Sequence, residues 1–527
     1  MTDLLHDLLP AAAASAADRI AVVDRGQSVT YAELNQLVDG AAAGLTALGV
    51  LRGDRVAVLM PKRVEKVAAL IAVLKAGAIA VPVNALLKAP QVGHILRDSG
   101  AAALITNAGR MPDLLAELGV LSGLRAIVVV EDADCEPVGG LAVVPWSQLV
   151  ANQGPIAGRP APNDAAMIFY TSGSTGKSKG VVVSHRNLTV GARSVAEYLK
   201  CRPEDRVLAT LSFSFDYGFN QIATTLLVGA TLVLLDYRLP QEVLLTIERE
   251  HITALAGVPP IWIQLAALDW PPAAARSLRY ITNSGGAVPK ATLKRLRALL
   301  PDTRIYLMYG LTEAFRSTFL PPEELDRRPD SIGRAIPDAE VLVLRPDGRP
   351  CAVDEPGELV HRGPLVAQGY WNDAEKTARR FRAVPGQAPN MADPEREVWS
   401  GDTVRKDEEG FLYFIGRQDD MIKTSGFRVS PTEIEEEAYA SGLVRDAVAV
   451  GAPHERLGQG VVLVVTPAQE GEVDSDRLLD ALKRRLPRFM LPLRIEWREA
   501  LPRNPNGKYD RALLRGEFQQ VFAGERG

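Results

Sequence analysis

The feature that most constrains this sequence is a recurring unit, in which an amphipathic helical pattern is followed by a short apolar run rich in β-branched residues. In one unit residues 65–76 have helical spacing, Gly77 ends the helix and residues 78–83 form the apolar run. Similar units occupy residues 92–106, 241–258 and 291–309. Helices that alternate with apolar strands favour helix-covered sheets whose strands are mostly parallel, so the sequence predicts an α/β fold.

Composition and charge exclude several classes of protein. With 47% apolar and 24% charged residues, the 527-residue chain is that of an ordinary globular protein. Its 60 basic and 64 acidic side chains give a net charge of −4, which argues against a nucleic-acid partner. No apolar run approaches the ~18 uncharged residues of a membrane span. Only three cysteines are present and the start lacks a basic signal segment, so we expect a cytoplasmic protein.

The pattern changes near residue 417. Residues 417–420 form a short charged connector, and Ser430 and Glu433 have the spacing of a capping box at a helix start. The following segments predict a small α+β unit, with strands at residues 444–450, 461–466 and 493–497 and a helix at 476–486. We therefore predict an N-terminal domain of residues 1–417 and a C-terminal domain of residues 418–527, joined by a connector short enough to act as a hinge.

The most informative segment is residues 171–180, Thr-Ser-Gly-Ser-Thr-Gly-Lys-Ser-Lys-Gly, directly after the apolar run at residues 165–170. Its glycines let backbone amides point inward, and its hydroxyls and lysines add donors and charge, which suits a polyphosphate. The end of the segment imitates a Walker A loop, but Thr171 stands where the first glycine of that loop belongs. A GxSxG pattern around Ser178 is flanked by lysines and abuts no strand, so a hydrolase is disfavoured.

Further motifs follow this loop in a fixed order. They are Tyr-Gly-Leu-Thr-Glu at 309–313, Ser-Gly-Asp at 400–402, Gly-Arg at 416–417 and Asn-Gly-Lys at 506–508, with supporting motifs at 30–34, 357–359 and 369–370. In this order the whole chain resembles the adenylate-forming superfamily (ANL) of acyl-CoA synthetases, nonribosomal peptide adenylation domains and firefly luciferase. Residues 213–221 and 311–324 also resemble the AMP-forming acyl-CoA ligases associated with exosortase A. The resemblance implies a large N-terminal body of helix-covered sheets and a small, mobile C-terminal domain.

The resemblance also implies an activity. A carboxylic acid is activated by ATP, with Mg²⁺, to an acyl-AMP with release of pyrophosphate, and is then transferred to the pantetheine thiol of coenzyme A or of a carrier protein. One alternative is a stand-alone enzyme that adenylates an amino acid and loads only a carrier protein. A more remote alternative is a non-catalytic nucleotide-binding relative.

For the nucleotide, the resemblance implies that Tyr309 stacks on adenine, that Asp402 binds both ribose hydroxyls and that Arg417 adds a ribose or phosphate contact. The implied ATP-binding set is Thr171, Ser172, Gly173, Ser174, Thr175, Gly176, Lys177, Lys179, Gly285, Gly286, Ala287, Met308, Tyr309, Gly310, Asp402 and Arg417.

The implied catalytic set is Lys508, Thr312 and Glu313. A cation at Lys508 stabilises the charge that develops when an acid carboxylate attacks the α-phosphate. Thr312 bonds the α-phosphate or the acyl carbonyl, and Glu313 holds Mg²⁺ together with Thr175. Asp419 matches the hinge position, and the loop that lines the thiol side contains Lys423, Gly426, Phe427 and Arg428.

The predicted acid pocket consists of Phe215, Asp216, Tyr217, Asn220, Gly257, Ser284 and Arg316. Asp216 falls where amino-acid-adenylating domains pair an aspartate with the substrate ammonium. A buried carboxylate without a cation is costly, so an amino substrate would explain it. Arg316 could instead be an internal partner of Asp216, or could bind a second substrate carboxylate. The acid is therefore an amino acid or a small to medium organic acid, and a long fatty chain is disfavoured.

Overall fold

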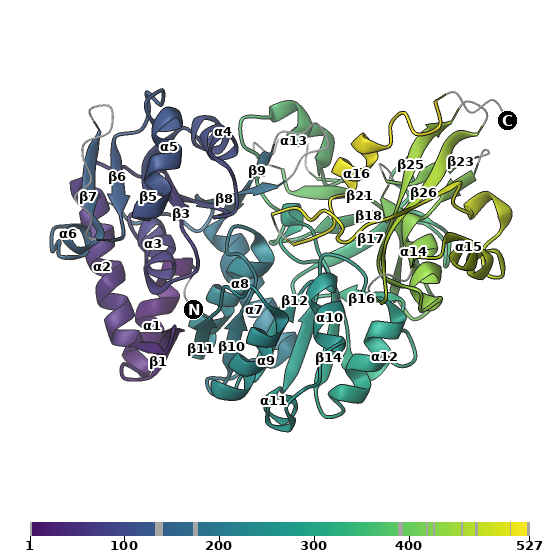
Figure 1. Ribbon diagram of the computed structural model, residues 1–527. Helices are drawn as coiled ribbons and strands as arrows, with labels where there is room; N and C mark the ends of the chain where they lie inside the picture. The colour runs from purple at the N-terminus through teal and green to yellow at the C-terminus, as the bar shows by residue number, and fades with distance from the viewer. Residues whose placement is uncertain are drawn as a thin grey trace.

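The computed structural model describes residues 3–131, 141–156, 158–171, 178–387, 394–417, 420–424, 427–454, 457–469, 473–505 and 507–523 (Figure 1). The recurring helix–strand units predicted from the sequence are confirmed. They are α3 (Val64–Lys75) with β4 (Ile79–Val83), α4 (Ala89–Ser99) with β5 (Ala101–Thr106), α9 (Pro240–Arg249) with β12 (Ala254–Gly257), and α12 (Lys290–Leu299) with β14 (Arg304–Tyr309). Gly77 and Gly100 end the first two helices with positive φ angles of 74° and 59°, which explains the glycines.

The first sheet has eight strands among the described residues, in the order β19-β9-β8-β4-β3-β5-β6-β7. The strands not yet given are β3 (Arg55–Leu59), β6 (Ala126–Val129), β7 (Ala142–Pro145), β8 (Ala165–Thr171), β9 (Lys179–Ser184) and β19 (Gly369–Tyr370). Apolar side chains of β3 alternate between two clusters, one shared with α2 (Tyr31–Ala47) and α3 and the other with α4 and α5 (Met111–Leu118). Helices therefore cover both faces, as Figure 1 shows on its purple and blue side.

The second sheet has fourteen strands in the described chain, and its two halves differ. The neighbours β1 (Ile20–Asp24), β11 (Thr231–Leu234), β10 (Arg206–Ala209), β12, β13 (Tyr280–Asn283) and β14 are parallel. At one edge β2 (Gln27–Thr30) pairs with β1 in an antiparallel manner. Beyond β14 all strand pairs of the sheet that the structure describes are antiparallel. The strands of this half are β15 (Thr318–Leu320), β16 (Ser331–Ala335), β17 (Glu340–Leu344), β18 (Gly357–Arg362), β20 (Phe381–Ala383), β21 (Arg396–Lys406) and β22 (Leu412–Arg417). The prediction of mostly parallel strands is wrong for residues 318–417, where most successive strands are joined without crossover helices.

The third sheet contains β23 (Ile422–Thr424), β24 (Phe427–Val429), β25 (Val444–His454), β26 (Gly458–Pro467) and β27 (Arg494–Trp497). It packs with α14 (Pro431–Ala440), α15 (Ser475–Lys483) and α16 (Arg511–Glu517), which matches the predicted α+β unit. The predicted capping box is wrong: Ser430 is the N-cap residue, but its backbone carbonyl, not its side chain, accepts the N–H of Glu433 at 3.2 Å. The division at 417/418 stays a prediction.

The remaining helices are α1 (Leu8–Ser15), α6 (Trp146–Val150), α7 (His185–Leu199), α8 (Asp216–Val228), α10 (Pro259–Ala266), α11 (Pro272–Ser277) and α13 (Ala374–Arg380). A capping box does form at the start of α2, where Thr30 and Glu33 exchange hydrogen bonds, and this explains the motif at residues 30–34. In the part of the chain that the structure describes, no helix has the length and apolar content that crossing a membrane requires.

The topology fixes where a site can form. The chain leaves β10 for β11 on one side and then returns to β12 on the other side of β10, so the strand order reverses at β10. Crevices outside the carboxyl ends of parallel strands at such a point are common binding places. The loop after β10 and the start of α8 lie there, beside the loops after β12, β13 and β14. Figure 1 shows a yellow C-terminal segment that reaches out of the third sheet towards this edge.

Candidate active site

An ionic cluster joins Lys179 of the predicted ATP-binding set to Glu313 of the predicted catalytic set. The Lys179 ammonium, at the start of β9, donates to Glu313 Oε1 at 2.9 Å and to the Tyr370 hydroxyl at 2.8 Å. Tyr370 in turn donates to the same Glu313 oxygen at 2.6 Å. Three segments therefore meet at the Glu313 carboxylate: the strand after the glycine-rich loop, the turn after β14 and the Gly-Tyr motif at residues 369–370.

The electrostatics of this cluster keep Glu313 charged. Burial by itself would raise the pKa of Glu313, but the Lys179 ammonium and the Tyr370 hydroxyl outweigh burial and lower that pKa to about 2. An ionised carboxylate is the donor that a hard cation such as Mg²⁺ prefers. The described residues contain no cluster of three or more His, Cys, Asp or Glu side chains that could bind a metal by itself. The ionised Glu313 carboxylate is a fitting ligand for Mg²⁺.

A second cluster forms where β14 faces β21 and β22. The Tyr309 hydroxyl donates a short hydrogen bond to Asp402 Oδ2, and Arg417 Nε donates to Asp402 Oδ1 at 2.9 Å. Burial, together with the Asp402 carboxylate, raises the pKa of Tyr309 well above its usual value. Asp402 is buried, whereas the Arg417 side chain is 54% exposed. The structure thus brings the predicted adenine and ribose residues together.

Asp216, a residue of the predicted acid pocket at the first position of α8, has a cation partner. Arg316 Nη1 lies 3.3 Å from Asp216 Oδ2, and the Thr312 hydroxyl donates to Asp216 Oδ1 at 3.0 Å. Arg316 is 2% exposed and its guanidinium lies over the Tyr217 ring at 4.4 Å. Of the alternatives open for Asp216, the structure shows the internal pair with Arg316, so the buried charge of Asp216 does not by itself require an ammonium group on the substrate.

Some polar groups of the predicted acid pocket and of residues beside it are buried. Tyr217 donates to the Thr282 carbonyl at 2.9 Å. The side-chain oxygens of Asn220 and Asn283 and Nε of Arg316 are buried without a hydrogen-bond partner. Such groups are costly unless they are paired, so they are candidates for bonds to a substrate.

The other predicted pocket residues are buried as well. Phe215 is 6% and Ser284 3% exposed, and both lie at this edge of the second sheet. A side-chain carbon on Gly257 would lie 2.7 Å from the ring of Trp262, so the glycine is needed because the indole packs there. Sequence reasoning considered Gly257 and passed over Trp262, which forms this wall of the site.

Lys508 reaches the body of the protein from the C-terminal segment. A side-chain carbon on Gly285, whose φ is +84°, would lie 2.5 Å from Cε and 3.0 Å from Nζ of Lys508. The lysine therefore lies across the turn after β13, and the absence of a side chain at Gly285 makes this approach possible. Burial lowers the pKa of Lys508, while the nearby Asp216 carboxylate opposes that shift. Asn283 Nδ2 holds the turn by donating to the Gly286 carbonyl at 2.9 Å.

Other predicted residues, most of them from the ATP-binding set, lie in different surroundings or outside the described residues. Met308 is buried and its sulfur accepts from the Tyr198 hydroxyl at 3.0 Å, so its side chain belongs to the core. Gly310 is close to Arg316, and Gly286 and Ala287 are exposed. Thr171 Oγ1 is buried without a hydrogen-bond partner. Several predicted residues lie outside the described residues or have side chains outside them: Ser172, Gly173, Ser174, Thr175, Gly176, Lys177, Asp419, Lys423, Gly426, Phe427 and Arg428.

Two residues that sequence reasoning left out of the site take part in its contacts. Tyr370 belongs to a motif that the sequence does display, but only the fold shows that its hydroxyl meets Glu313. Asn84, at the end of β4, donates from Nδ2 to the Pro505 carbonyl in the Lys508 loop at 2.7 Å. Nothing in the sequence around Asn84 distinguishes it from an ordinary strand end.

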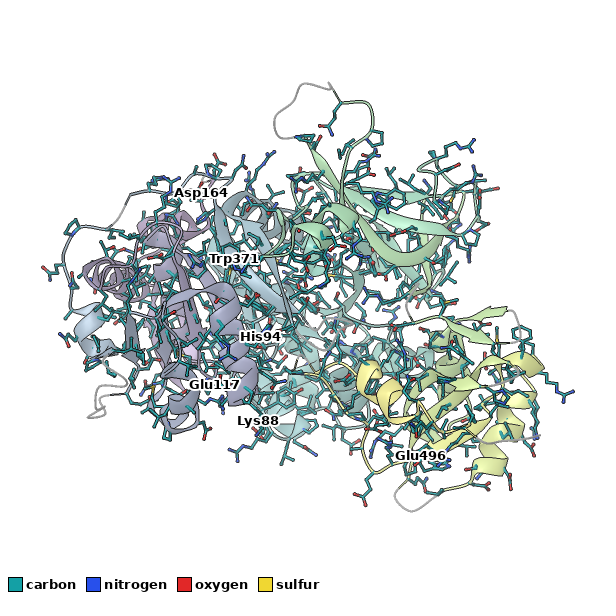
Figure 2. The ribbon with its side chains drawn as sticks, turned by 90° about the horizontal axis from the view of Figure 1, so that it is seen from above. Lys88, His94, Glu117, Asp164, Trp371 and Glu496 are labelled. Carbon is teal, nitrogen blue, oxygen red and sulfur yellow. The ribbon has the colours of Figure 1, made fainter. Side chains whose placement is uncertain are left out.

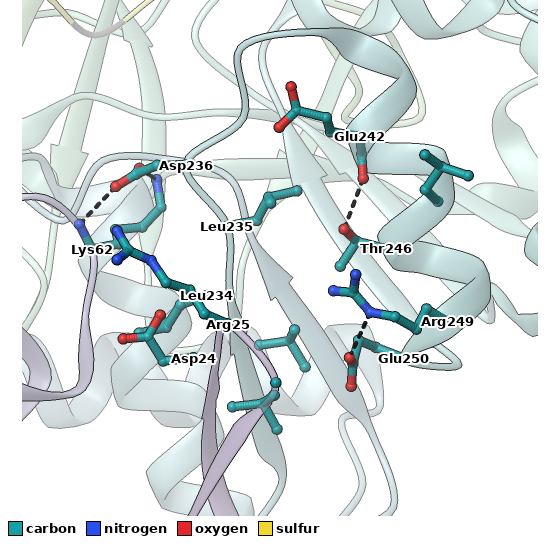
Figure 3. A pocket seen from close by; sticks show the side chains of 14 residues that line it. Asp24, Arg25, Lys62, Leu234, Leu235, Asp236, Glu242, Thr246, Arg249 and Glu250 are labelled. Atoms are coloured by element: carbon teal, nitrogen blue, oxygen red, sulfur yellow. Dashed lines mark hydrogen bonds and ion pairs between the residues drawn. The ribbon is translucent and has the colours of Figure 1, made fainter.

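A separate cavity of about 320 Å³ lies at the carboxyl ends of β1 and β11, beside α9 (Figure 3). None of the predicted site residues lines it. Four of its charged side chains pair with one another, Lys62 with Asp236 at 2.5 Å and Arg249 with Glu250 at 3.0 Å. The convergence of predicted residues occurs elsewhere, at the edge formed by β10, β12, β13 and β14.

Comparison with known protein families gives two matches. The model of the AMP-binding enzyme family matches residues 9–371, and the model of the AMP-binding enzyme C-terminal domain matches residues 433–508.

Individual relatives match most of the chain. Feruloyl-CoA synthase of Amycolatopsis sp is 32% identical over 95% of this chain and 96% of its own length. The L-proline--[L-prolyl-carrier protein] ligase of Streptomyces coelicolor is 34% identical over 92% of this chain and 91% of its own length. A linear gramicidin synthase protein of Brevibacillus parabrevis is 31% identical over 98% of this chain, which spans 10% of that much longer protein.

Two solved structures are similar over nearly the full length. The anthranilate CoA ligase AuaEII, in complex with anthranoyl-AMP, has a TM-score of 0.88 at 25% identity and covers 99% of this chain and 98% of its own. The o-succinylbenzoate coenzyme A synthetase MenE of Bacillus subtilis, in complex with ATP and magnesium ion, has a TM-score of 0.81 at 26% identity, over 97% of this chain and 99% of its own. These similarities confirm the fold class predicted from the sequence.

Proposed function

This chain belongs to the family of AMP-binding enzymes, and from that premise we propose that it is an AMP-forming acid–thiol ligase. It activates a carboxylic acid with ATP, forming an acyl-AMP and releasing pyrophosphate. The thiol of a pantetheine group, on coenzyme A or on a carrier protein, then takes the acyl group and AMP leaves. Relatives that are CoA ligases and a carrier-protein ligase support both halves of this reaction.

The observation that carries the proposal is the convergence at Gly285. Lys508, from the far end of the chain, lies across the turn after β13, and its charge interacts with Asp216 and Asp402. A single cation is thereby held between the predicted acid pocket and the predicted ribose site. That is where a carboxylate and an α-phosphate have to meet, and a fixed cation there stabilises the charge of the transition state.

The residues around Lys508 have distinct proposed roles. Thr312, whose hydroxyl now bonds Asp216, donates to the α-phosphate or to the acyl carbonyl. Glu313 and Thr175 hold Mg²⁺, and the low pKa of Glu313 fits that role. When bound, the ion supplies positive charge to the phosphates. Because Lys179 donates to Glu313, its ammonium is also near enough to pair with phosphate when ATP is present.

We also propose a nucleotide site, which is supported by the contacts of Tyr309, Asp402 and Arg417. Tyr309, with its hydroxyl fixed by Asp402, presents an aromatic face for adenine. Asp402 has free lone pairs on both oxygens for the ribose hydroxyls, and the exposed Arg417 can turn towards ribose or phosphate. The unpartnered hydroxyl of Thr171 is available to a phosphate oxygen at the start of the glycine-rich loop.

The second half-reaction needs another surface. We assign residues 418–527 to a mobile domain that rotates about Asp419, so that the loop containing Lys423, Gly426, Phe427 and Arg428 replaces Lys508 beside the acyl-AMP. The apolar clusters of the third sheet support an independent unit, because the residues in them run from Ile422 to Phe522 and none comes from the larger body.

The acid is proposed to be small or medium-sized and to carry a polar group, amino acids included. The carboxylate–guanidinium pair of Asp216 and Arg316 and the unpartnered oxygens of Asn220 and Asn283 support this class. A long alkyl chain would have to bury its methylene groups against these charges.

One experiment tests the function. Pyrophosphate release is measured with ATP, Mg²⁺ and a panel of amino, hydroxy, aryl and straight-chain acids, first alone and then with coenzyme A or a holo carrier protein. We expect release with at least one polar acid, and thioester formation with one of the two thiols. If the protein binds ATP but releases pyrophosphate with no acid of the panel, the proposed ligase activity is contradicted and the non-catalytic nucleotide-binding relative is favoured. Thioester formation with only the carrier protein would identify the stand-alone carrier-loading enzyme.

A further inference from the structure

We propose that Asn84 is a positioning residue that docks the Lys508 loop onto the N-terminal body and so favours the adenylate-forming arrangement. The inference rests on the proposed role of Lys508. Asn84 touches neither of the predicted substrate sites through any described contact. It acts through the Pro505 carbonyl, to which its Nδ2 donates at 2.7 Å.

The side chain of Asn84 is built to make this contact. Asn84 follows β4 in the first sheet and is 6% exposed. Its Oδ1 accepts the backbone N–H of Leu86 at 2.9 Å, which forms a local turn and fixes the side-chain torsions. The Leu86 group can only donate and the Pro505 carbonyl can only accept, so one orientation of the amide satisfies both partners. The donor of Asn84 is therefore aimed at the C-terminal segment.

The loop transmits this contact to the lysine. Within it Asn504 N–H donates to the Lys508 carbonyl at 2.7 Å, Gly507 N–H donates to the Asn504 carbonyl at 2.9 Å, and Asp510 N–H donates to the Pro502 carbonyl at 2.9 Å. A loop closed by its own backbone bonds moves as a unit. Fixing Pro505 therefore fixes the direction from which Lys508 approaches Gly285.

The other end of the loop is tied to the third sheet. The Tyr509 hydroxyl donates to Asp446 Oδ1 at 2.6 Å, and Asp446 on β25 also accepts from Thr466 on β26 at 2.7 Å. The loop thus belongs mechanically to the C-terminal unit, while Asn84 belongs to the first sheet. In Figure 2 the yellow segment extends from the third sheet towards Lys88, which marks the loop after β4.

This hydrogen bond exists only in one relative orientation of the two units. If the C-terminal unit rotates, Pro505 leaves Asn84 and the buried amide loses its acceptor. An unmade buried hydrogen bond shifts such an equilibrium by about 5- to 10-fold. Asn84 therefore biases the free enzyme towards the arrangement with Lys508 in place, and it does so without contributing to the thiol-dependent step.

The test uses the full-length enzyme and two variants. Asn84→Asp keeps the oxygen that accepts from Leu86 but removes the donor, and Asn84→Ala removes both. Asn152→Asp is the matched control, because its Oδ1 likewise accepts a local N–H, that of Gly154, at 2.8 Å. Hydrogen–deuterium exchange of the peptide covering residues 502–510 is followed with and without Mg²⁺ and ATP, and β26 serves as the internal measure of folding.

In both Asn84 variants we expect the loop peptide to exchange about 5- to 10-fold faster, with exchange in β26 and in the control unchanged. With an acid that the wild type activates, ATP–pyrophosphate exchange should fall in both variants by at most that factor, because activity follows the docked fraction, while thioester formation from a supplied acyl adenylate does not fall. Wild-type exchange rates in the loop and equal losses in both half-reactions would each overturn the proposal. A wild type that activates no acid would instead overturn the proposed function, and the loop exchange would still decide whether Asn84 docks the loop.

Discussion

Lys508→Ala is the substitution that separates the two proposed half-reactions most sharply. The side chain is not used to hold its own loop, because the bonds that close the loop join backbone groups and the Asn504 side chain. Truncation to alanine removes a cation from between the proposed acid pocket and the proposed ribose site and leaves the loop closed. The loss should therefore be one of transition-state stabilisation and not of folding.

The size of the loss follows from the position of the ammonium. It lies across Gly285, where Asp216 and Asp402 are the carboxylates that interact with it. A preorganised donor of this kind, held in a partly dry site, contributes about 3–4 kcal/mol to a step in which anionic charge develops. Adenylate formation should fall about 10²- to 10³-fold. Transfer from a supplied acyl adenylate to the thiol should survive, because the proposed rotation removes Lys508 before that step.

The assay pairs ATP–pyrophosphate exchange with thioester formation from a separately prepared acyl adenylate, using an acid found in the screen. Arg503→Ala is the matched control, since Arg503 is an exposed cation of the same loop. We expect the control to keep both activities within about 3-fold, because its nearest carboxylate, Asp446, lies at 3.8 Å. Equal losses in the two half-reactions for Lys508→Ala, or an equal loss in the control, would refute the division of labour.

Three further predictions follow from other parts of the chain. Asp216→Asn keeps an acceptor for Thr312 but removes the negative charge beside the buried Arg316 guanidinium, so KM should rise about 10-fold for every acid that the wild type activates, and unchanged KM values would contradict a place for the Asp216–Arg316 pair in the acid pocket. Asp419→Pro should leave pyrophosphate exchange largely intact and block thioester release, since a fixed φ hinders rotation, and unchanged thioester output would remove the hinge assignment. Burial and the neighbouring His6 lower the pKa of His185 from 6.5 to about 3. As the pH falls below about 7, this histidine is therefore protonated in the unfolded chain but not in the folded protein, and the free energy of unfolding decreases. The difference in unfolding free energy between pH 8 and pH 5, measured with urea, should be about 2 kcal/mol smaller in His185→Phe than in the wild type. The same difference in both proteins would show that His185 does not cause the pH dependence.

Local patterns predicted the local structure well. Residues 92–99 with Gly100 and residues 101–106 became α4 and β5, because an apolar stripe and a glycine stop are properties of adjacent residues. Local patterns could not predict the strand pairing in the antiparallel half of the second sheet. Its strand β16 pairs with β22, which begins at Leu412, and nothing in either segment specifies the other.

The same limit applies to the candidate site. Motifs showed which residue types take part, but not which of them neutralise one another. Asp216 and Arg316 are distant in sequence, and only the packing of α8 against the turn after β14 makes them a pair. Tyr370 was visible as part of a motif, yet its bond to Glu313 depends on β19 joining the edge of the first sheet beside β9. Partner choice among buried charges is a property of the fold.

The contacts between the C-terminal unit and the body are the hardest to anticipate, and there is a physical reason for this. The proposed rotation between two half-reactions does not allow a large apolar interface to hold one arrangement, because the energy of separating it would enter every turnover. The described polar contacts fit this requirement, since they include one amide hydrogen bond from Asn84, a long one from Lys290 N–H to Glu436 at 3.5 Å, and the approach of Lys508 to Gly285. The helix α14 also contacts α12 and β22. Single polar contacts leave almost no pattern in a sequence, whereas the separate apolar clusters on either side leave a strong one. The residues that choose between the two arrangements should therefore be sought among isolated buried polar side chains such as Asn84.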